Sequence, residues 1–247
     1  MPDPPPYPIV VGVTGHRDIA TGSREAVRAA VHAVLEGLKA EFGDALHVMT
    51  ALADDADQLV ADEAEKLDLK MIAVSPMPLA TYRATVTNRD RLDHHWDRAV
   101  LRLELSELCN LAEPGYAELH YEQFGALLCR RCHLLLALWD GLPATAAHGG
   151  APERGGTADV VRTRREGEHD VAGFGKSPLF AGAGSRLDLS PGGPVLQVVT
   201  PRSKTGGAVQ VPGRPSVAAG DCFLLPGAND GPRRSRLPLS REACSPR

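Results

Sequence analysis

IVVGVTGHRD, at residues 9–18, joins a short apolar run to a polar turn. The β-branched run suits a buried strand, and Gly12 and Gly15 let the backbone turn sharply and approach a ligand closely. Backbone amides at a strand-to-helix turn form an anion site, to which Arg17 adds donors suited to phosphate or carboxylate. The stretch therefore predicts the first strand of an α/β domain. It also predicts an anion-binding loop, the alternative being a tight structural turn with an exposed arginine.

A helix is predicted directly after this turn. Apolar residues recur at helical spacing from Val27 to Phe42, Ser23 is a suitable N-cap, and Gly43 is a suitable stop. Strands are predicted at residues 46–51, 70–74, 133–139 and 195–199, and helices from Asp54 or Asp55 to 67, within 92–103, at 118–129 and from 157. This alternation favours a doubly wound parallel sheet with right-handed crossovers. We expect a single α/β domain over residues 8–201.

The ligand site is predicted at one edge of this sheet. Residues 133–139 are almost continuously apolar, which is typical of a central strand covered on both faces. Ligands of open parallel sheets bind at the carboxyl ends of the strands. This rule places four loops together, at residues 14–18, 51–57, 75–83 and 140–157.

The first two of these loops contain polar candidates for ligand contact. Thr14 and His16 flank Gly15, and an imidazole such as that of His16 can titrate near neutral pH. Asp57 begins the second helix, where its carboxylate could accept hydrogen bonds from ribose hydroxyls. Helix capping and dipole interactions explain a carboxylate at this position equally well.

The fourth loop contributes candidates at both of its ends. Asp140 follows the central strand, where an open sheet exposes ligand-facing groups, although Asp140-Gly141 also has the composition of a simple turn. Gly155, Gly156 and Thr157 combine backbone freedom with a hydroxyl at a helix start. They could bind a phosphate or the edge of a sugar.

Composition narrows the functional class. The net charge of −4 and pI near 6.1 give no support for wholesale electrostatic binding to nucleic acid. The start of the chain lacks the pattern of a signal peptide, and no apolar run is long enough to span a membrane. Five cysteines without framework spacing argue against a secreted disulfide scaffold. We therefore expect a cytoplasmic protein without membrane contact.

No cofactor or metal site is predicted. Cys129 and Cys132 form a CxxC that runs into an apolar strand, which favours two reduced, partly buried cysteines. His94 and His95 lie among acidic residues, but adjacent histidines on a helix point about 100° apart and do not easily face one ion. We interpret that segment as a solvated helix face.

Residues 202–247 differ in composition from the rest of the chain. They contain six prolines and six glycines, with eight basic and three acidic side chains, and only residues 222–225 form an apolar run. We expect a disordered or weakly attached basic tail that adds little to stability. The tail has a net charge of +5 and the whole chain a net charge of −4, so the net charge of the remaining residues is about −9.

The ordered motifs resemble the SLOG superfamily over about residues 9–202. That superfamily groups the LOG-type phosphoribohydrolases, the Rossmann-like domain of the DNA-processing protein and many nucleotide sensors of bacterial defence systems. Residues 11–17 resemble its opening GxTGHR. Further matches are Leu52-Ala53 with Ala56-Asp57, Leu59-Val60-Ala61, Leu136-Ala137-Leu138-Trp139-Asp140-Gly141, Gly155-Gly156-Thr157-Ala158-Asp159-Val160-Val161 and Val198-Val199-Thr200-Pro201-Arg202.

The resemblance implies a Rossmann-like fold that binds a nucleotide or a nucleotide-derived ligand. It implies that Gly12, Gly15 and Arg17 line the phosphate end and that Asp57 faces the sugar. It further implies that Gly155, Gly156 and Thr157 close the site. It also implies an effector protein that reads the bound state, and it is compatible with a homo-oligomer.

The sequence departs from the family at two positions. Asp55 stands where the family often has a glycine, and its carboxylate would repel a nearby phosphate. Val160 stands where the hydrolytic branch carries a catalytic glutamate, and a valine cannot perform acid–base chemistry. The second departure favours binding over catalysis.

Three functions follow, in decreasing order of support. The first is a non-catalytic nucleotide-ligand sensor. The second is a nucleoside 5′-monophosphate phosphoribohydrolase in which Asp57 or Asp159 replaces the missing glutamate. The third is a binder of single-stranded DNA, which the negative charge of the folded part disfavours.

Overall fold

The computed structural model describes residues 7–143, 155–166, 168–170, 186–188, 193–211 and 214–225. Residues 144–154, which belong to the fourth predicted ligand loop, lie outside the described residues. The same holds for residues 226–247 of the predicted tail.

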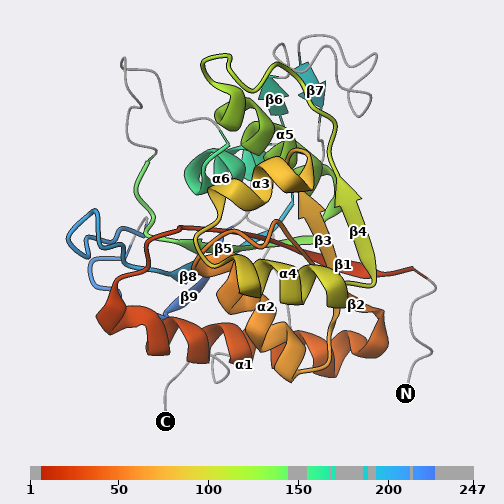
Figure 1. Cartoon of the computed structure of the whole chain (residues 1–247). Helices are drawn as coiled ribbons and strands as arrows, with labels where there is room; N and C mark the ends of the chain where they lie inside the picture. The colour runs from red at the N-terminus through yellow and green to blue at the C-terminus, as the bar shows by residue number, and fades with distance from the viewer. Residues whose placement is uncertain are drawn as a thin grey trace.

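A seven-stranded sheet forms the centre of the molecule (Figure 1). Its strands lie in the order β4-β3-β2-β1-β5-β8-β9, and all neighbours are parallel except β8 and β9. The bounds are β1 Ile9–Gly15, β2 Leu46–Thr50, β3 Lys70–Ser75, β4 Leu101–Glu104, β5 Leu134–Trp139, β8 Val195–Val199 and β9 Cys222–Leu225. A separate antiparallel pair joins β6 (Glu168–Asp170) and β7 (Arg186–Asp188). The predicted doubly wound α/β sheet is confirmed.

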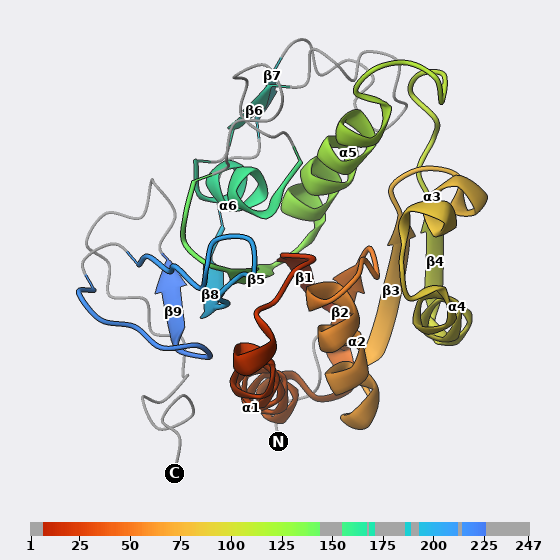
Figure 2. The same ribbon diagram turned by 60° about the vertical axis from the view of Figure 1, so that its left-hand side comes forward.

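Helices cover both faces of this sheet (Figure 2). Their bounds are α1 Arg24–Phe42, α2 Ala56–Lys66, α3 Leu79–Thr85, α4 Arg89–Arg98, α5 Tyr116–Arg131 and α6 Thr157–Glu166, with short 3₁₀ turns at Thr21–Ser23 and Gly43–Ala45. On one face, α1 and α2 pack on β1, β5 and β8 in one apolar cluster. On the other face, α5 and α6 take part in a second cluster. The central strands are therefore buried from both sides, as their apolar sequence predicts.

Helix α1 forms where the apolar spacing predicts it. Its buried side chains are Val27, Val31, Val34, Leu35 and Leu38, which recur every three or four residues along one face. Gly43 ends the helix with a φ of 53°, a conformation that glycine adopts without steric cost. Local sequence and tertiary packing therefore agree at this element.

The segment after β3 differs from the prediction. Residues 79–85 form α3, which the sequence did not identify, and α4 ends at Arg98 rather than near residue 103. Ala99 is extended, and the amide of Val100 donates to the carbonyl of Met71 at 2.9 Å. Residues 101–104 therefore leave the helical pattern and form β4 beside β3, because a nonlocal partner strand was available.

The predicted start of the tail at residue 202 needs correction. Cys222–Leu225 form β9, which pairs with β8 in the main sheet, and Leu225 is buried. The amide of Val199 donates to the carbonyl of Asp221 at 2.8 Å, which extends this attachment. The folded unit therefore continues beyond residue 201, through residues 202–211 and 214–225.

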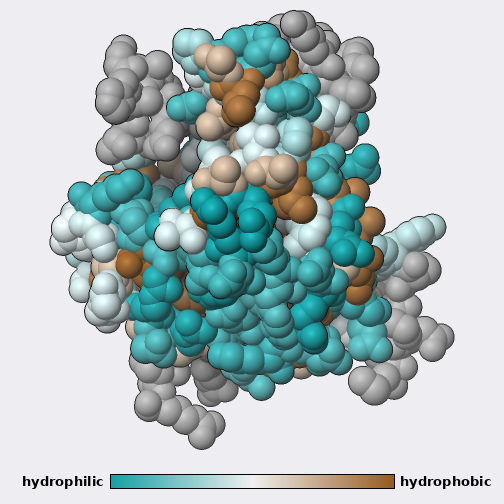
Figure 3. Space-filling model, in the orientation of Figure 1, coloured by the Kyte–Doolittle hydropathy of each residue, from teal (hydrophilic) through white to brown (hydrophobic). Residues whose placement is uncertain are grey.

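The surface over α1, α2 and α4 is strongly hydrophilic (Figure 3). Exposed apolar residues do occur beside and on the edge strand β4, where Val100 is 60% and Leu101 46% exposed. None of the helices in the described ranges is both long and apolar enough to cross a bilayer.

Candidate functional site

A cavity of about 290 Å³ lies at the carboxyl ends of the parallel strands. Strand order reverses between β1 and β5, and this switch point is where open α/β sheets bind ligands. The cavity volume is near the lower end of the range for small-molecule sites. Its polar and glycine lining is Thr14, Gly15, His16, Arg17, Asp18, Asp57, Tyr82, Glu118, Tyr121, Gly155, Gly156, Thr157, Arg202 and Lys204.

The loop after β1 is held by backbone hydrogen bonds on both sides. The amide of His16 donates to the carbonyl of Leu138 at 3.2 Å, and the amide of Ala56 donates to the carbonyl of His16 at 3.3 Å. A Cβ at Gly15 would lie 2.3 Å from the Cβ of Ala56 and 3.0 Å from that of Leu138. Only glycine therefore lets β1, β5 and the start of α2 meet at this distance.

Arg17 is the cation that this loop presents to the cavity. Its guanidinium lies 4.8 Å from the ring centre of Tyr121 on α5, in a cation–π contact. No carboxylate within the described ranges forms an ion pair with it. Burial tends to lower the pKa of Arg17, but Tyr82, Tyr121 and Asp57 outweigh burial and raise this pKa. The side chain is therefore a permanent cation with capacity for an anionic partner.

Asp57 is a buried acid in the same cavity, 4% exposed. Its Oδ2 accepts hydrogen bonds from the hydroxyl of Thr50 at 3.0 Å and from the amide of Ala53 at 3.4 Å. Burial raises the pKa of the carboxyl to about 6, while the Thr50 bond and the charge of Arg17 oppose the increase. Asp57 is therefore mostly ionised at neutral pH and protonated in mild acid.

Tyr82, from α3, supplies an unpaired donor. The residue is fully buried, and its hydroxyl has no hydrogen-bond partner within the described residues. Burial raises the pKa of this phenol well above its ordinary value, so the hydroxyl keeps its proton. A buried polar group without a partner costs free energy, and a ligand oxygen at this position would satisfy it.

The start of α6 forms another wall of the cavity. Gly155 has a φ of 70°, and a Cβ there would lie 2.4 Å from the amide nitrogen of Glu122 on α5. Its amide donates to Oδ2 of Asp159 at 3.1 Å. The first-turn amides of a helix lack intrahelical acceptors and carry a partial positive charge. Gly156 and Thr157 therefore bring the partial positive charge of a helix N-terminus to the cavity.

Two further cations come from the segment that the sequence assigned to the tail. Nε of Arg202 donates to Oδ1 of Asp18 at 2.8 Å, and the amide of Lys204 donates to Oδ2 of the same carboxylate at 3.2 Å. Asp18 thus anchors this segment beside the first loop, with Lys204 exposed at the cavity. The sequence signal was the position of Arg202, three residues after the end of a predicted strand.

Two predicted site residues do not line the cavity. Gly12 lies inside β1, where a Cβ would approach Cδ1 of Leu128 to 2.7 Å and the Cβ of Cys132 to 2.8 Å, so we reassign it to packing against α5. Asp140 is buried: its Oδ1 accepts from the amide of Leu142 at 3.0 Å, and it lies 3.2 Å from Nε2 of His16. Asp140 therefore shapes the turn after β5 and supports His16.

Other predictions concerned carboxylates and thiols near the site. Asp55 makes no side-chain cap to α2; it pairs with Arg24 instead and does not line the cavity. Cys129 and Cys132 are free and buried, as expected. Burial raises the pKa of both thiols, which suits an inert packing role.

The two carboxylates considered for hydrolysis are placed differently. Asp159 pairs with Arg162 at 2.6 Å and is absent from the cavity lining, whereas Asp57 lines the cavity. Val160, at the position of the hydrolase glutamate, also lines it with an apolar side chain. Glu118 adds an exposed carboxylate from α5 that the sequence did not identify.

Comparison with known proteins gives a distant structural likeness. No protein-family model and no curated protein matches the chain. An X-ray structure of DNA processing protein A from Streptococcus pneumoniae is similar, with 17% sequence identity and a TM-score of 0.37. The likeness covers 53% of this chain and 41% of that chain, so the match spans less than half of that protein. The SLOG assignment stays a prediction.

Proposed function

We propose that the cavity binds a nucleotide or nucleotide-derived ligand without hydrolysing it. The observation that carries this proposal is Arg17, a guanidinium without a carboxylate partner in the described part of the chain, presented to a cavity at the switch point of the sheet. A planar guanidinium binds a phosphate, as it binds a carboxylate, with two parallel hydrogen bonds.

The remaining lining fits the other parts of a nucleotide. The α6 amides at Gly156 and Thr157, together with Lys204, would share the phosphate charge with Arg17. Asp57 would accept hydrogen bonds from sugar hydroxyls, and the unpaired hydroxyl of Tyr82 would donate to a ligand oxygen. A sensor of this kind would pass its bound state to an effector protein.

Hydrolysis of an N-glycosidic bond is the second candidate, and one observation favours it. Asp57 is a buried carboxyl with a pKa of about 6, a value suited to acid–base chemistry near neutral pH. The apolar Val160 at the position of the hydrolase glutamate opposes it. We therefore rank binding above hydrolysis.

The first experiment is a thermal-shift screen of the full chain. Nucleoside monophosphates, NAD, ADP-ribose, cyclic nucleotides and a single-stranded oligonucleotide are tested, and each stabilising compound is analysed for breakdown after incubation. Stabilisation with the ligand recovered intact supports a sensor. Release of free base establishes the hydrolase, and stabilisation by the oligonucleotide alone refutes a small-ligand site.

Substitution of Arg17 locates the binding. Arg17→Ala should weaken binding of a phosphate-bearing hit by about 10- to 100-fold, because it removes charge-assisted hydrogen bonds. Arg17→Lys should retain part of the affinity, since a lysine keeps the charge but not the bidentate geometry. Arg102→Ala, at an exposed position outside the cavity, is the matched control. Equal affinity in the wild type and the three variants would show that Arg17 does not contact the ligand.

A further inference from the structure

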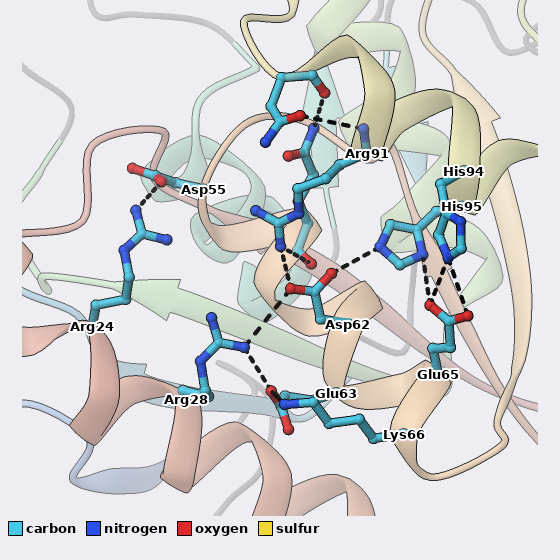
Figure 4. Close-up of polar contacts among 12 residues, drawn as sticks. Arg24, Arg28, Asp55, Asp62, Glu63, Glu65, Lys66, Arg91, His94 and His95 are labelled. Atoms are coloured by element: carbon cyan, nitrogen blue, oxygen red, sulfur yellow. Dashed lines mark hydrogen bonds and ion pairs between the residues drawn. The ribbon is translucent and has the colours of Figure 1, made fainter.

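A second polar cluster joins α1, α2 and α4 outside the cavity (Figure 4). Arg28 pairs with Glu63 at 2.8 Å between α1 and α2, and Arg91 pairs with Asp62 between α4 and α2. Next to these pairs, Glu65 of α2 faces both His94 and His95 of α4. One ligand atom from each of these three residues lies within 4.8 Å of the other two.

His95 is the informative member of this group. Its side chain is 2% exposed, and its Nε2 lies 2.9 Å from Oδ1 of Asp62. An ionised carboxylate only accepts hydrogen bonds, so this contact places the ring proton on Nε2 and leaves a lone pair on Nδ1. Nδ1 is buried without a hydrogen-bond partner and lies 3.7 Å from Oε2 of Glu65. Two acceptors thus face each other, and a cation between them would satisfy both.

His94 approaches the same carboxylate from the exposed side. Its Nε2 lies 2.9 Å from Oε2 of Glu65, and its side chain is 50% exposed. The two rings meet edge to face with their centres 5.0 Å apart. His94 approaches Glu65 with Nε2, the ring nitrogen farther from its backbone, and His95 approaches it with Nδ1, the nearer one. This difference offsets the angle between adjacent helix positions. Adjacent positions on the helix therefore do not prevent these two histidines from approaching one carboxylate.

We propose that Nε2 of His94, Nδ1 of His95 and Oε2 of Glu65 bind a transition-metal dication of the zinc class. Ligands about 2.0–2.1 Å from a tetrahedral ion lie about 3.3 Å from one another. The two distances to Oε2, 2.9 and 3.7 Å, bracket this separation. Mixed imidazole and carboxylate ligands suit zinc better than magnesium or calcium, which take oxygen ligands.

The surroundings supply the supporting contacts that such a site needs. Asp62 orients His95 in the carboxylate–histidine arrangement that tunes metal ligands. Nε of Arg98 forms an ion pair with Oε1 of Glu65 at 2.8 Å, so Oε2 is the oxygen that remains for the ion. A surface cavity of about 330 Å³, lined in part by Glu65 and His95, gives an entry path. With three protein ligands, the fourth position is open to water.

Zinc titration of the chelator-treated full chain tests this site. Isothermal calorimetry with a zinc salt should show one saturable site, and His94→Ala and Glu65→Gln should each weaken it by about tenfold or more. His94 is exposed, so its substitution should leave the fold intact by circular dichroism. His32→Ala is the matched control, because His32 forms a similar surface contact with Glu63 at 3.0 Å.

Cobalt(II) provides a readout that separates this site from the cysteines. Substitution of cobalt should give the visible absorption of a four- or five-coordinate ion without sulfur-to-metal charge transfer, and His94→Ala should abolish it. The proposal is overturned by the absence of saturable zinc binding or by sulfur charge transfer. It is equally overturned if both site variants bind zinc as the wild type does, or if His32→Ala weakens binding equally.

Discussion

The ionisation of Asp57 should couple folding stability to pH. Burial raises the pKa of its carboxyl from the ordinary 3.8 to about 6 in the folded protein. The folded state therefore holds a proton that the unfolded chain releases between these values. The stability from this group is fully present below pH 3.8 and is lost as the pH rises through 6. At about 1.36 kcal/mol per pKa unit, the loss is roughly 3 kcal/mol.

Urea unfolding of the wild type and Asp57→Asn between about pH 4 and pH 7 measures this effect. The other titrating groups are common to both proteins, so the difference between the two free energies of unfolding isolates Asp57. As the pH rises, the free energy of unfolding of the wild type should fall by roughly 3 kcal/mol relative to that of Asp57→Asn. The asparagine can still accept from Thr50 and Ala53, whose bonds both go to one oxygen.

Arg17→Ala provides the internal check. Because the charge of Arg17 lowers the pKa of Asp57, its removal should raise this pKa further and move the transition to higher pH. Affinity for a ribose-bearing ligand should increase as the pH rises through 6 in the wild type and stay level in Asp57→Asn. A difference curve that is flat to within about 0.5 kcal/mol would refute the assignment of a buried, perturbed carboxyl.

Three further predictions concern packing and charge. A chain that stops after Asp221 lacks β9, so it loses the burial of Leu225 and exposes the edge of β8. Its free energy of unfolding in urea should be lower by roughly 3 kcal/mol. Unchanged stability would show that β9 is not attached. Gly15→Ala should cost about 1–3 kcal/mol because its Cβ overlaps that of Ala56, whereas Gly22→Ala, which meets open space, should leave the unfolding midpoint nearly unchanged. Lys204→Ala should weaken phosphate-ligand binding at low salt more than at high salt, since an exposed charge is screened; a salt-independent loss would contradict this.

Local pattern was sufficient for most of the fold. The helix over Arg24–Phe42 and the strands on either side of it could be predicted because side-chain periodicity and β-branched runs are properties of neighbouring residues. Their alternation then restricted the topology to a parallel sheet. The same rules located the edge where Arg17 and Asp57 line one cavity, since the carboxyl ends of parallel strands lie together.

Only the tertiary structure decided which residues share a site. Gly12 and Gly15 have the same local signal, yet Gly12 packs on α5 and Gly15 lies at the cavity, because Gly12 is inside β1 and Gly15 is at its carboxyl end. Tyr82 and Lys204 arrive from segments without a clear local pattern. In the same way, β9, β4 and the approach of Glu65 to His95 depend on contacts between distant residues. Periodicity predicts which face of an element is buried, but the partner that covers that face is set by the folded chain as a whole.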